Sequence, residues 1–176
     1  MSSPTINLAE FLPLVQPHAP GASIPIITQA LRLAAIDFCE RTRCWRQIIT
    51  VETDDDGRAT PSPAYAAIHE FEYAVFDGDT PLAPVAFTDL DPAERRAEGR
   101  PGYITQTAPA EVRVIPAAAG ALELSVFLKP RQGQDFALDT DGLPVNAYDT
   151  APEFLYRLHG ETIAAGALSR LLIQPQ

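Results

Sequence analysis

Apolar residues recur at helical spacing near both ends of the chain and at every second position through much of its middle. In the N-terminal part, Ser23 can cap a helix that begins at Ile24 and continues for about 22 residues to Trp45. The apolar face of this predicted helix carries Ile27, Leu31, Ala34, Ala35, Phe38 and Trp45. A short helix or turn is expected at residues 7–15, and a proline-rich bend separates it from the long helix.

The C-terminal part predicts a second long helix, of about 20 residues. Thr150 and Glu153 have the T-x-x-E spacing of a capping box, which places the start of the helix there. Its apolar positions cover a wide arc: Phe154, Leu158, Ala165, Leu168 and Leu172 on one face, with Leu155, Ile163, Ala167 and Leu171 beside them. Such an arc predicts a helix sandwiched between other elements, and we expect the two long helices to pack together.

The middle of the chain has the period of two that is typical of half-buried antiparallel strands. Residues 46–53 and 64–76 each predict a strand, and residues 100–106 a shorter one. In the second strand the expected core face carries Tyr65, Ala67, His69, Phe71, Tyr73 and Val75, and the opposite face carries Glu70 and Glu72. Residues 110–116 and 121–129 predict a hairpin, and a short exposed helix is expected within residues 88–99.

These elements predict an α+β fold in which N- and C-terminal helices pack as a small bundle, with an inserted antiparallel β-rich lobe that projects as a separate part. The expected domains are a helical domain of residues 1–45 and 150–176, a β-rich insertion of residues 46–130, and an acidic loop or linker of residues 131–149. With 176 residues, of which 46% are hydrophobic, the chain is long enough to bury a sizeable core.

The net charge of the chain limits the kinds of binding partner that we expect. The formal net charge is −10 and the pI about 4.6, so the chain as a whole repels phosphate backbones. A protein that wraps nucleic acid is therefore not expected, whereas a protein that surrounds DNA without gripping it is compatible with this charge. No apolar stretch is long enough to cross a bilayer, and residues 1–9 do not resemble a signal peptide, so we expect a cytosolic protein without a membrane partner.

The motifs of common enzymes and cofactor sites are absent from the sequence, so we expect no catalytic residue and no cofactor. Cys39 and Cys44 are expected to be reduced, with Cys39 in a core, and the scattered histidines do not suggest a zinc site. Two acidic clusters, Asp54–Asp56 and Asp135, Asp139 and Asp141, lack the EF-hand spacing and are interpreted as solvated loops.

The stretch FCERTRCWR, residues 38–46, concentrates charge and aromatic surface. Arg41, Arg43 and Arg46 with Trp45 could stack on bases and bind nucleic acid. In the simpler interpretation, Trp45 anchors the helix end to the β-rich region and the arginines pair with carboxylates of this chain or of a neighbour.

Five segments together resemble the head-to-tail adaptor proteins of tailed bacteriophages, a group related to tail tubular protein A. They are FLPLVQPHAPGAS, AAIDFCERTRCWR, FDGDTPLAP, GRPGYIT and LYRLHGETIAAGALSRLL, in this order between Glu10 and Leu172. The most specific parts are the arginine- and tryptophan-containing helix end and the motif IAAGALSRLL.

The resemblance implies a structural, non-enzymatic protein of the virion neck, assembled in the host cytoplasm. It implies a homo-oligomeric ring of about twelve copies beneath the portal protein, which continues the DNA channel without sequence-specific binding and joins a downstream neck or tail protein. Relatives often extend a C-terminal segment into the portal, whereas only Ile173, Gln174, Pro175 and Gln176 follow the motif here. We expect partner or inter-subunit contacts at these four residues and at Arg41, Arg43, Trp45 and Arg46.

The sequence is also compatible with two other functions. One is a small nucleic-acid-binding module that uses the arginine and tryptophan helix end, and it predicts a salt-sensitive affinity for DNA. The other is a small hydrolase that uses the acidic clusters with a divalent metal, and it predicts an activity that a chelator abolishes.

Overall fold

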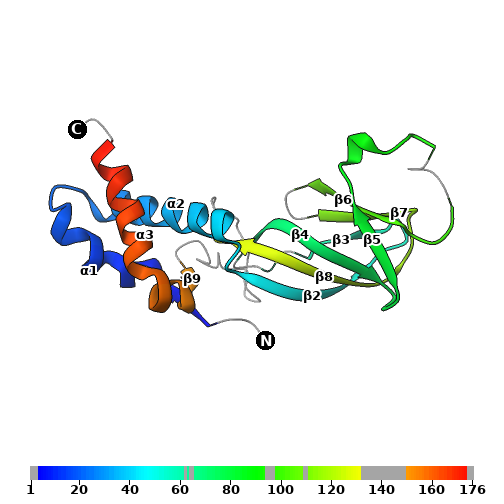
Figure 1. Ribbon diagram of the computed structural model, residues 1–176, viewed down its shortest axis with the longest axis horizontal. Helices are drawn as coiled ribbons and strands as arrows, with labels where there is room; N and C mark the ends of the chain where they lie inside the picture. The colour runs from blue at the N-terminus through cyan, green and yellow to red at the C-terminus, as the bar shows by residue number, and fades with distance from the viewer. Residues whose placement is uncertain are drawn as a thin grey trace, which may run out of the picture. The chain divides into compact units, whose positions relative to one another are not determined.

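The structure is a computed structural model, and it describes residues 4–61, 63, 66–93, 98–108, 111–131 and 150–173. It is a mixed α/β protein that divides into two compact units (Figure 1). The helical unit comprises Met1–Thr42 and Lys129–Gln176, and the sheet unit comprises Arg43–Leu128. The acidic linker expected at residues 131–149 lies outside the described residues, apart from Arg131.

The helical unit is built from segments near both ends of the chain. Its described elements are β1 (Thr5–Asn7), the 3-10 helices η1 (Leu8–Phe11) and η2 (Gln16–His18), α1 (Leu12–Val15), α2 (Ile24–Thr42), β9 (Thr150–Pro152) and α3 (Glu153–Ile173). Strands β1 and β9 pair antiparallel, so the segment before η1 lies beside the segment that enters α3.

The two long helices pack against each other, as the sequence predicted. At one contact a Cβ on Gly166 of α3 would lie 3.3 Å from the Cβ of Ala34 of α2. At another, the ring of His159 lies on the ring of Phe38, with centroids 4.7 Å apart. The core of the unit is apolar and includes Phe11, Ile27, Leu31, Ala35, Leu155, Ile163 and Ala167.

The boundaries of both long helices differ from those expected. Helix α2 ends at Thr42 instead of continuing to Trp45, because Arg43 has a φ of 53°, which a right-handed helix does not accommodate. Helix α3 begins at Glu153, and Thr150 pairs with Asn7 in the β1–β9 ladder. The N-cap position of α3 is therefore residue 152, and Thr150, which lies two residues before it in extended backbone, does not cap the helix.

The sheet unit holds one seven-stranded sheet in the order β2-β8-β4-β5-β6-β7-β3. The strands are β2 (Arg46–Thr53), β3 (Arg58–Ala59), β4 (Ala67–Phe76), β5 (Thr80–Pro84), β6 (Tyr103–Ala108), β7 (Glu111–Ile115) and β8 (Gly120–Lys129). The strands at the two ends of this order, β2 and β3, are consecutive in the chain and contact each other, since the Asp54 amide donates to the Arg58 carbonyl at 2.9 Å. The sheet is therefore nearly closed.

Strand β2 confirms the strand expected at residues 46–53, but the one expected strand pairing was wrong. Strands β7 and β8 do not form a hairpin: β7 lies between β6 and β3, and β8 lies between β2 and β4. The expected antiparallel sheet also contains one parallel pair, β5 with β6. The connection from Val85 to Gly102 is long enough to return the chain to the same end of the sheet, which a parallel pair requires.

The core face of β4 was also assigned to the wrong side. The buried side chains of this strand are Ile68, Ala74 and Phe76, whereas the described members of the expected core face, from Ala67 to Val75, are only half-buried. The sheet core also includes Leu122, Leu124, Val126 and Leu128 of β8 and Val112, Val114 and Ile115 of β7. In the region of the expected short helix the structure has a 3-10 turn, η3 (Phe87–Asp89), while residues 94–97 lie outside the described part.

Candidate partner-binding surfaces

Arg41 lies in the last turn of α2, in the helical unit. Its Nε donates to Asp37 Oδ1 at 2.9 Å, one turn earlier on the same helix. The second carboxylate oxygen of Asp37 lies 3.3 Å from the guanidinium of Arg170 on α3. Asp37 therefore faces two arginines, and the charge of Arg41 is balanced within its own unit.

Arg43 and Arg46 belong to the sheet unit, and both reach strand β4. Arg43 pairs with Glu70 at 2.7 Å, and its guanidinium carbon lies 5.8 Å from the ring centroid of Phe127. Arg46 Nε lies 2.7 Å from Glu72 Oε2 and 2.9 Å from Ser125 Oγ. These contacts follow the simpler of the two interpretations, in which the arginines pair with carboxylates.

Trp45, between these arginines, is only 2% exposed. Its carbonyl accepts a hydrogen bond of 2.7 Å from the amide of Leu128, which holds the backbone before β2 against the end of β8. A buried indole cannot stack on a base without a rearrangement of the unit. Arg43 and Arg46 therefore both contact strand β4, whereas Trp45 is buried and is not part of the surface.

Of the four C-terminal candidates, the structure describes only Ile173, which ends α3 and is 77% exposed. Gln174, Pro175 and Gln176 lie outside the described residues.

The acidic cluster at residues 54–56 lies in the turn between β2 and β3, which Asp54 stabilises by hydrogen bonds. Asp54 Oδ1 accepts from the amide of Arg58 at 2.8 Å, and the Asp54 carbonyl accepts from the amide of Gly57 at 2.8 Å. The second cluster, Asp135, Asp139 and Asp141, lies outside the described residues. Within the part of the chain that the structure describes, no three side chains of metal-ligating type converge on one point.

Neither Cys39 nor Cys44 forms a disulfide bond with a described residue, and Cys39 is buried in the helical unit, as predicted. The ring of His159 on α3 packs against the ring of Phe38 on α2, and the histidine is half-buried. These contacts give structural roles to residues whose types also occur in catalytic sites.

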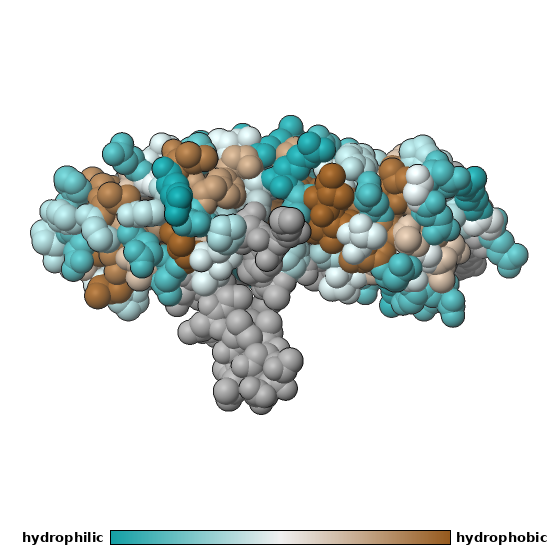
Figure 2. Space-filling model, turned by 90° about the horizontal axis from the view of Figure 1, so that it is seen from below, coloured by the Kyte–Doolittle hydropathy of each residue, from teal (hydrophilic) through white to brown (hydrophobic). Residues whose placement is uncertain are grey.

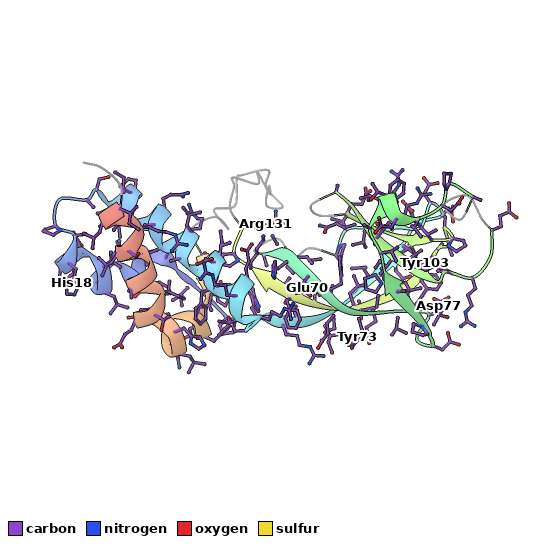
Figure 3. The ribbon with its side chains drawn as sticks, turned by 45° about the horizontal axis from the view of Figure 1, so that its top comes forward. His18, Glu70, Tyr73, Asp77, Tyr103 and Arg131 are labelled. Carbon is purple, nitrogen blue, oxygen red and sulfur yellow. The ribbon has the colours of Figure 1, made fainter. Side chains whose placement is uncertain are left out.

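Two titratable groups of the sheet unit are perturbed by their neighbours. Partial desolvation and the nearby carboxylate of Glu123 raise the pKa of the Tyr73 hydroxyl, which donates to Glu123 Oε1 at 3.3 Å. Tyr73 lies on β4, on the same strand as Glu70 (Figure 3). The hydrogen bond from Arg100, followed by that from Thr80, lowers the pKa of Asp79. Both groups remain in the protonation state they have in water at neutral pH, so neither indicates acid–base chemistry.

Exposed apolar side chains are the feature that the sequence did not reveal. Figure 2 shows hydrophobic side chains at the surface of both units, among hydrophilic ones. The large ones that are about half or more exposed are Ile24, Ile26, Ile48, Leu158, Leu172 and Ile173. Five of these six belong to the helical unit, although α3 was predicted to be sandwiched on its apolar faces.

A shallow apolar groove lies beside some of these residues. It has a volume of about 270 Å³ and runs between the first half of α2 and the last turns of α3. Its lining is formed by Pro25, Ile26, Gln29, Ala30, Leu33, Arg170 and Leu171. The helical unit thus presents both protruding and recessed apolar surface.

None of the helices in the described part of the chain has the length and apolar content needed to cross a membrane. A comparison with curated proteins finds no significant match. The model of the family described as SU10 adaptor protein, however, matches residues 6–170, which is nearly the whole chain. The chain therefore belongs to the SU10 adaptor protein family, a family of phage head-to-tail adaptors.

Proposed function

We propose that the chain is a structural subunit of the virion neck, which forms a ring beneath the portal protein and docks a downstream neck or tail protein. The observation that carries this proposal is the family match over residues 6–170. In this proposal the terminal helices act as a small bundle that holds the β-rich unit, about twelve copies close the ring, and assembly takes place in the host cytoplasm.

The charges of the chain support a ring through which DNA passes without adhering. A net charge of −10 per copy opposes the binding of a polyanion. The arginines of residues 38–46, which could have bound DNA, are each engaged by a carboxylate: Arg41 by Asp37, Arg43 by Glu70 and Arg46 by Glu72. The same pairs could exchange partners with a neighbouring copy and set the register of the ring more than its strength.

The proposed contact with the portal lies at the C-terminal end of α3. Ile173 ends the helix with most of its side chain in solvent, and Gln174, Pro175 and Gln176 follow it. An exposed isoleucine at the end of a helix offers an apolar anchor for a pocket on a partner.

The direct test is reconstitution with the portal protein of the same phage. Purified portal rings are mixed with the chain, and the complex is analysed by native mass spectrometry and electron microscopy. We expect about twelve copies of the chain on one face of each portal ring, in register with its channel. A chain that does not bind the portal at micromolar concentrations would contradict the proposal.

A DNA titration separates this function from the nucleic-acid-binding alternative. The chain and the portal–adaptor complex are each titrated with duplex DNA at low and at physiological salt. We expect no binding by the chain, because Arg43 and Arg46 are paired with carboxylates and the net charge is negative. A tight affinity that falls steeply with salt would favour the alternative.

A further inference from the structure

Helix α3 carries an exposed stripe with the spacing of a coiled-coil seam. The stripe consists of Leu158, Thr162, Ala165, Ser169 and Leu172, which follow one another at intervals of four, three, four and three residues. All five side chains are exposed, and the two leucines at the ends are 72% and 78% exposed. Alternation of four and three keeps residues on one side of a helix, so they form a single ridge about 21 Å long.

The composition of this ridge suits contact with another helical surface. Large apolar side chains stand at both ends, and the small residues Thr162, Ala165 and Ser169 lie between them and permit close approach. The two leucines leave apolar surface in water, and contact with another helical surface would bury it. The opposite side of α3, with Leu155, Ile163 and Ala167, is already buried in the helical unit.

The same unit carries a second apolar surface of the opposite shape. The groove between α2 and α3 is lined on its α2 side by Ile26, Ala30 and Leu33, which share one face of that helix. On α3 the groove residue Leu171 directly precedes the ridge residue Leu172, and consecutive helical residues are turned by about 100°. The ridge and the groove are therefore different faces of one unit.

Charges next to these two faces are complementary. Glu161 flanks the ridge, is exposed, and makes no ion pair with any residue that the structure describes. Arg170 lines the groove, where Asp37 lies 3.3 Å from its guanidinium. Asp37 is shared with Arg41, so this group of two guanidinium groups and one carboxylate beside the groove carries a net positive charge, which is complementary to Glu161.

We infer that the ridge of one copy packs into the groove of a second copy of this chain. A ring requires a heterologous contact, in which each subunit offers two different surfaces that fit each other, and the helical unit carries such a pair. This inference rests on the proposed function for the existence of the ring, and it adds which faces of the subunit close it. Leu158 and Leu172 are the anchoring residues of the contact, and Glu161 selects its orientation.

Cysteine cross-linking tests the contact directly. Ser169 on the ridge and Gln29 on the groove are replaced together by cysteine in a Cys44→Ser background, which leaves only the buried Cys39. We expect the double variant, assembled on portal rings and oxidised, to yield a ladder of covalent oligomers, since each copy is joined to the next. Ser169→Cys alone is expected to give no dimer, and a dimer from it would indicate a symmetric pair of ridges and overturn the inference.

Substitution of the anchoring leucines gives an independent measure. We expect Leu158→Gln with Leu172→Gln to weaken ring closure on the portal about tenfold or more, with an unchanged melting temperature, because both side chains are solvated in the free chain. Ile48→Gln, which removes a comparable exposed apolar side chain from the sheet unit, is the matched control and should assemble normally.

The outcomes separate the inference from the function on which it rests. A complete ring on the portal without a cross-linked ladder, or with normal assembly of the leucine variant, overturns the inference and leaves the proposed function intact. If the wild-type chain does not join the portal, the proposed function fails, and the double cysteine variant is oxidised as a free chain at high concentration. A ladder there still supports the ridge-in-groove contact, and its absence overturns it.

Discussion

Gly57 and Val114 approach each other closely where the sheet closes. The amide of Val114 donates to the carbonyl of Gly57 at 2.8 Å, and a Cβ at Gly57 would lie 2.9 Å from the Val114 carbonyl oxygen. Gly57 also has a φ of 72°, in the left-handed region. The turn between β2 and β3 therefore needs glycine for its backbone conformation and for the space beside β7.

Gly57→Ala should destabilise the sheet unit by two separate effects. The left-handed conformation costs a residue with a Cβ about 1–2 kcal/mol, and the close contact with Val114 adds about 1–3 kcal/mol. Gly78→Ala is the matched control, since Gly78 has a φ of 76° but no atom within 4 Å of the added Cβ. Urea unfolding of both variants measures the difference, and equal losses would show that the Val114 contact carries no cost.

Trp45→Ala should lower the free energy of unfolding by about 3–5 kcal/mol, because it empties a large buried site. Trp45→Phe keeps part of the packing and should lose less. As the chain has a single tryptophan, its fluorescence reports this site alone, and we expect blue-shifted emission that moves to longer wavelength on unfolding. An unchanged melting temperature in Trp45→Ala would show that the indole is not part of the core.

Local patterns predicted those elements whose signal is local. The strand at residues 46–53 and the length of α3 follow from periodicity, and the start of α2 at Ile24 follows from periodicity together with Ser23 and Pro25 beside it. The end of α2 was missed by three residues, because Arg43 gives no sequence signal for its left-handed backbone, which glycine or asparagine would have given.

Strand pairing could not be predicted in the same way, because partners are chosen by the whole sheet. The link between β7 and β8 is short enough for a hairpin, yet each strand has two other neighbours. The buried face of β4 was misassigned for a related reason. His69, Phe71 and Tyr73 are large and partly apolar, so their alternation resembles a core face although the strand buries Ile68, Ala74 and Phe76.

The surfaces of the site were only partly visible in the sequence. The pairing of arginines with carboxylates was expected in type, but Glu70 and Glu72 lie more than twenty residues away and could not be identified as partners. Leu158 and Leu172 were assigned to a buried helix face. An apolar side chain gives the same pattern whether it is covered by its own chain or meets another molecule, so only the fold separates the two cases.

The network of Arg46, Glu72 and Ser125 should stabilise the sheet unit mainly through its buried hydroxyl. Ser125 is fully buried, and its hydroxyl donates to Glu72 at 2.7 Å and accepts from Arg46. We expect Ser125→Ala to cost about 1 kcal/mol, whereas the coupling of the half-exposed Arg46–Glu72 pair should be only about 0.2–1 kcal/mol.

A double-mutant cycle with Arg46→Gln and Glu72→Gln measures that coupling. The matched control is the cycle for the exposed pair Arg41 and Asp37, which lacks a buried hydroxyl. We expect less coupling in the control. If the coupling energy between Arg46 and Glu72 is zero and Ser125→Ala does not change stability, water replaces these hydrogen bonds without loss of stability.

The carboxyl group of Asp79 should titrate below the usual range of an aspartate, because Arg100 and then Thr80 donate hydrogen bonds to its charged form. A folded-state pKa below the unfolded value of about 3.9 makes a contribution to stability that is present above that value and is lost as the pH falls through the folded pKa. Carbon-detected NMR titration of the Asp79 carboxyl gives the folded pKa.

Arg100→Gln should raise the folded pKa of Asp79 toward the unfolded value, since it removes the largest cause of the shift, whereas Thr80→Val should raise it less. If Arg100→Gln leaves the titration midpoint in place, the ion pair does not persist in solution, and the connection from β5 to β6 must be held at this point by its backbone hydrogen bonds, such as that from the Ala83 amide to the Gly102 carbonyl at 2.9 Å.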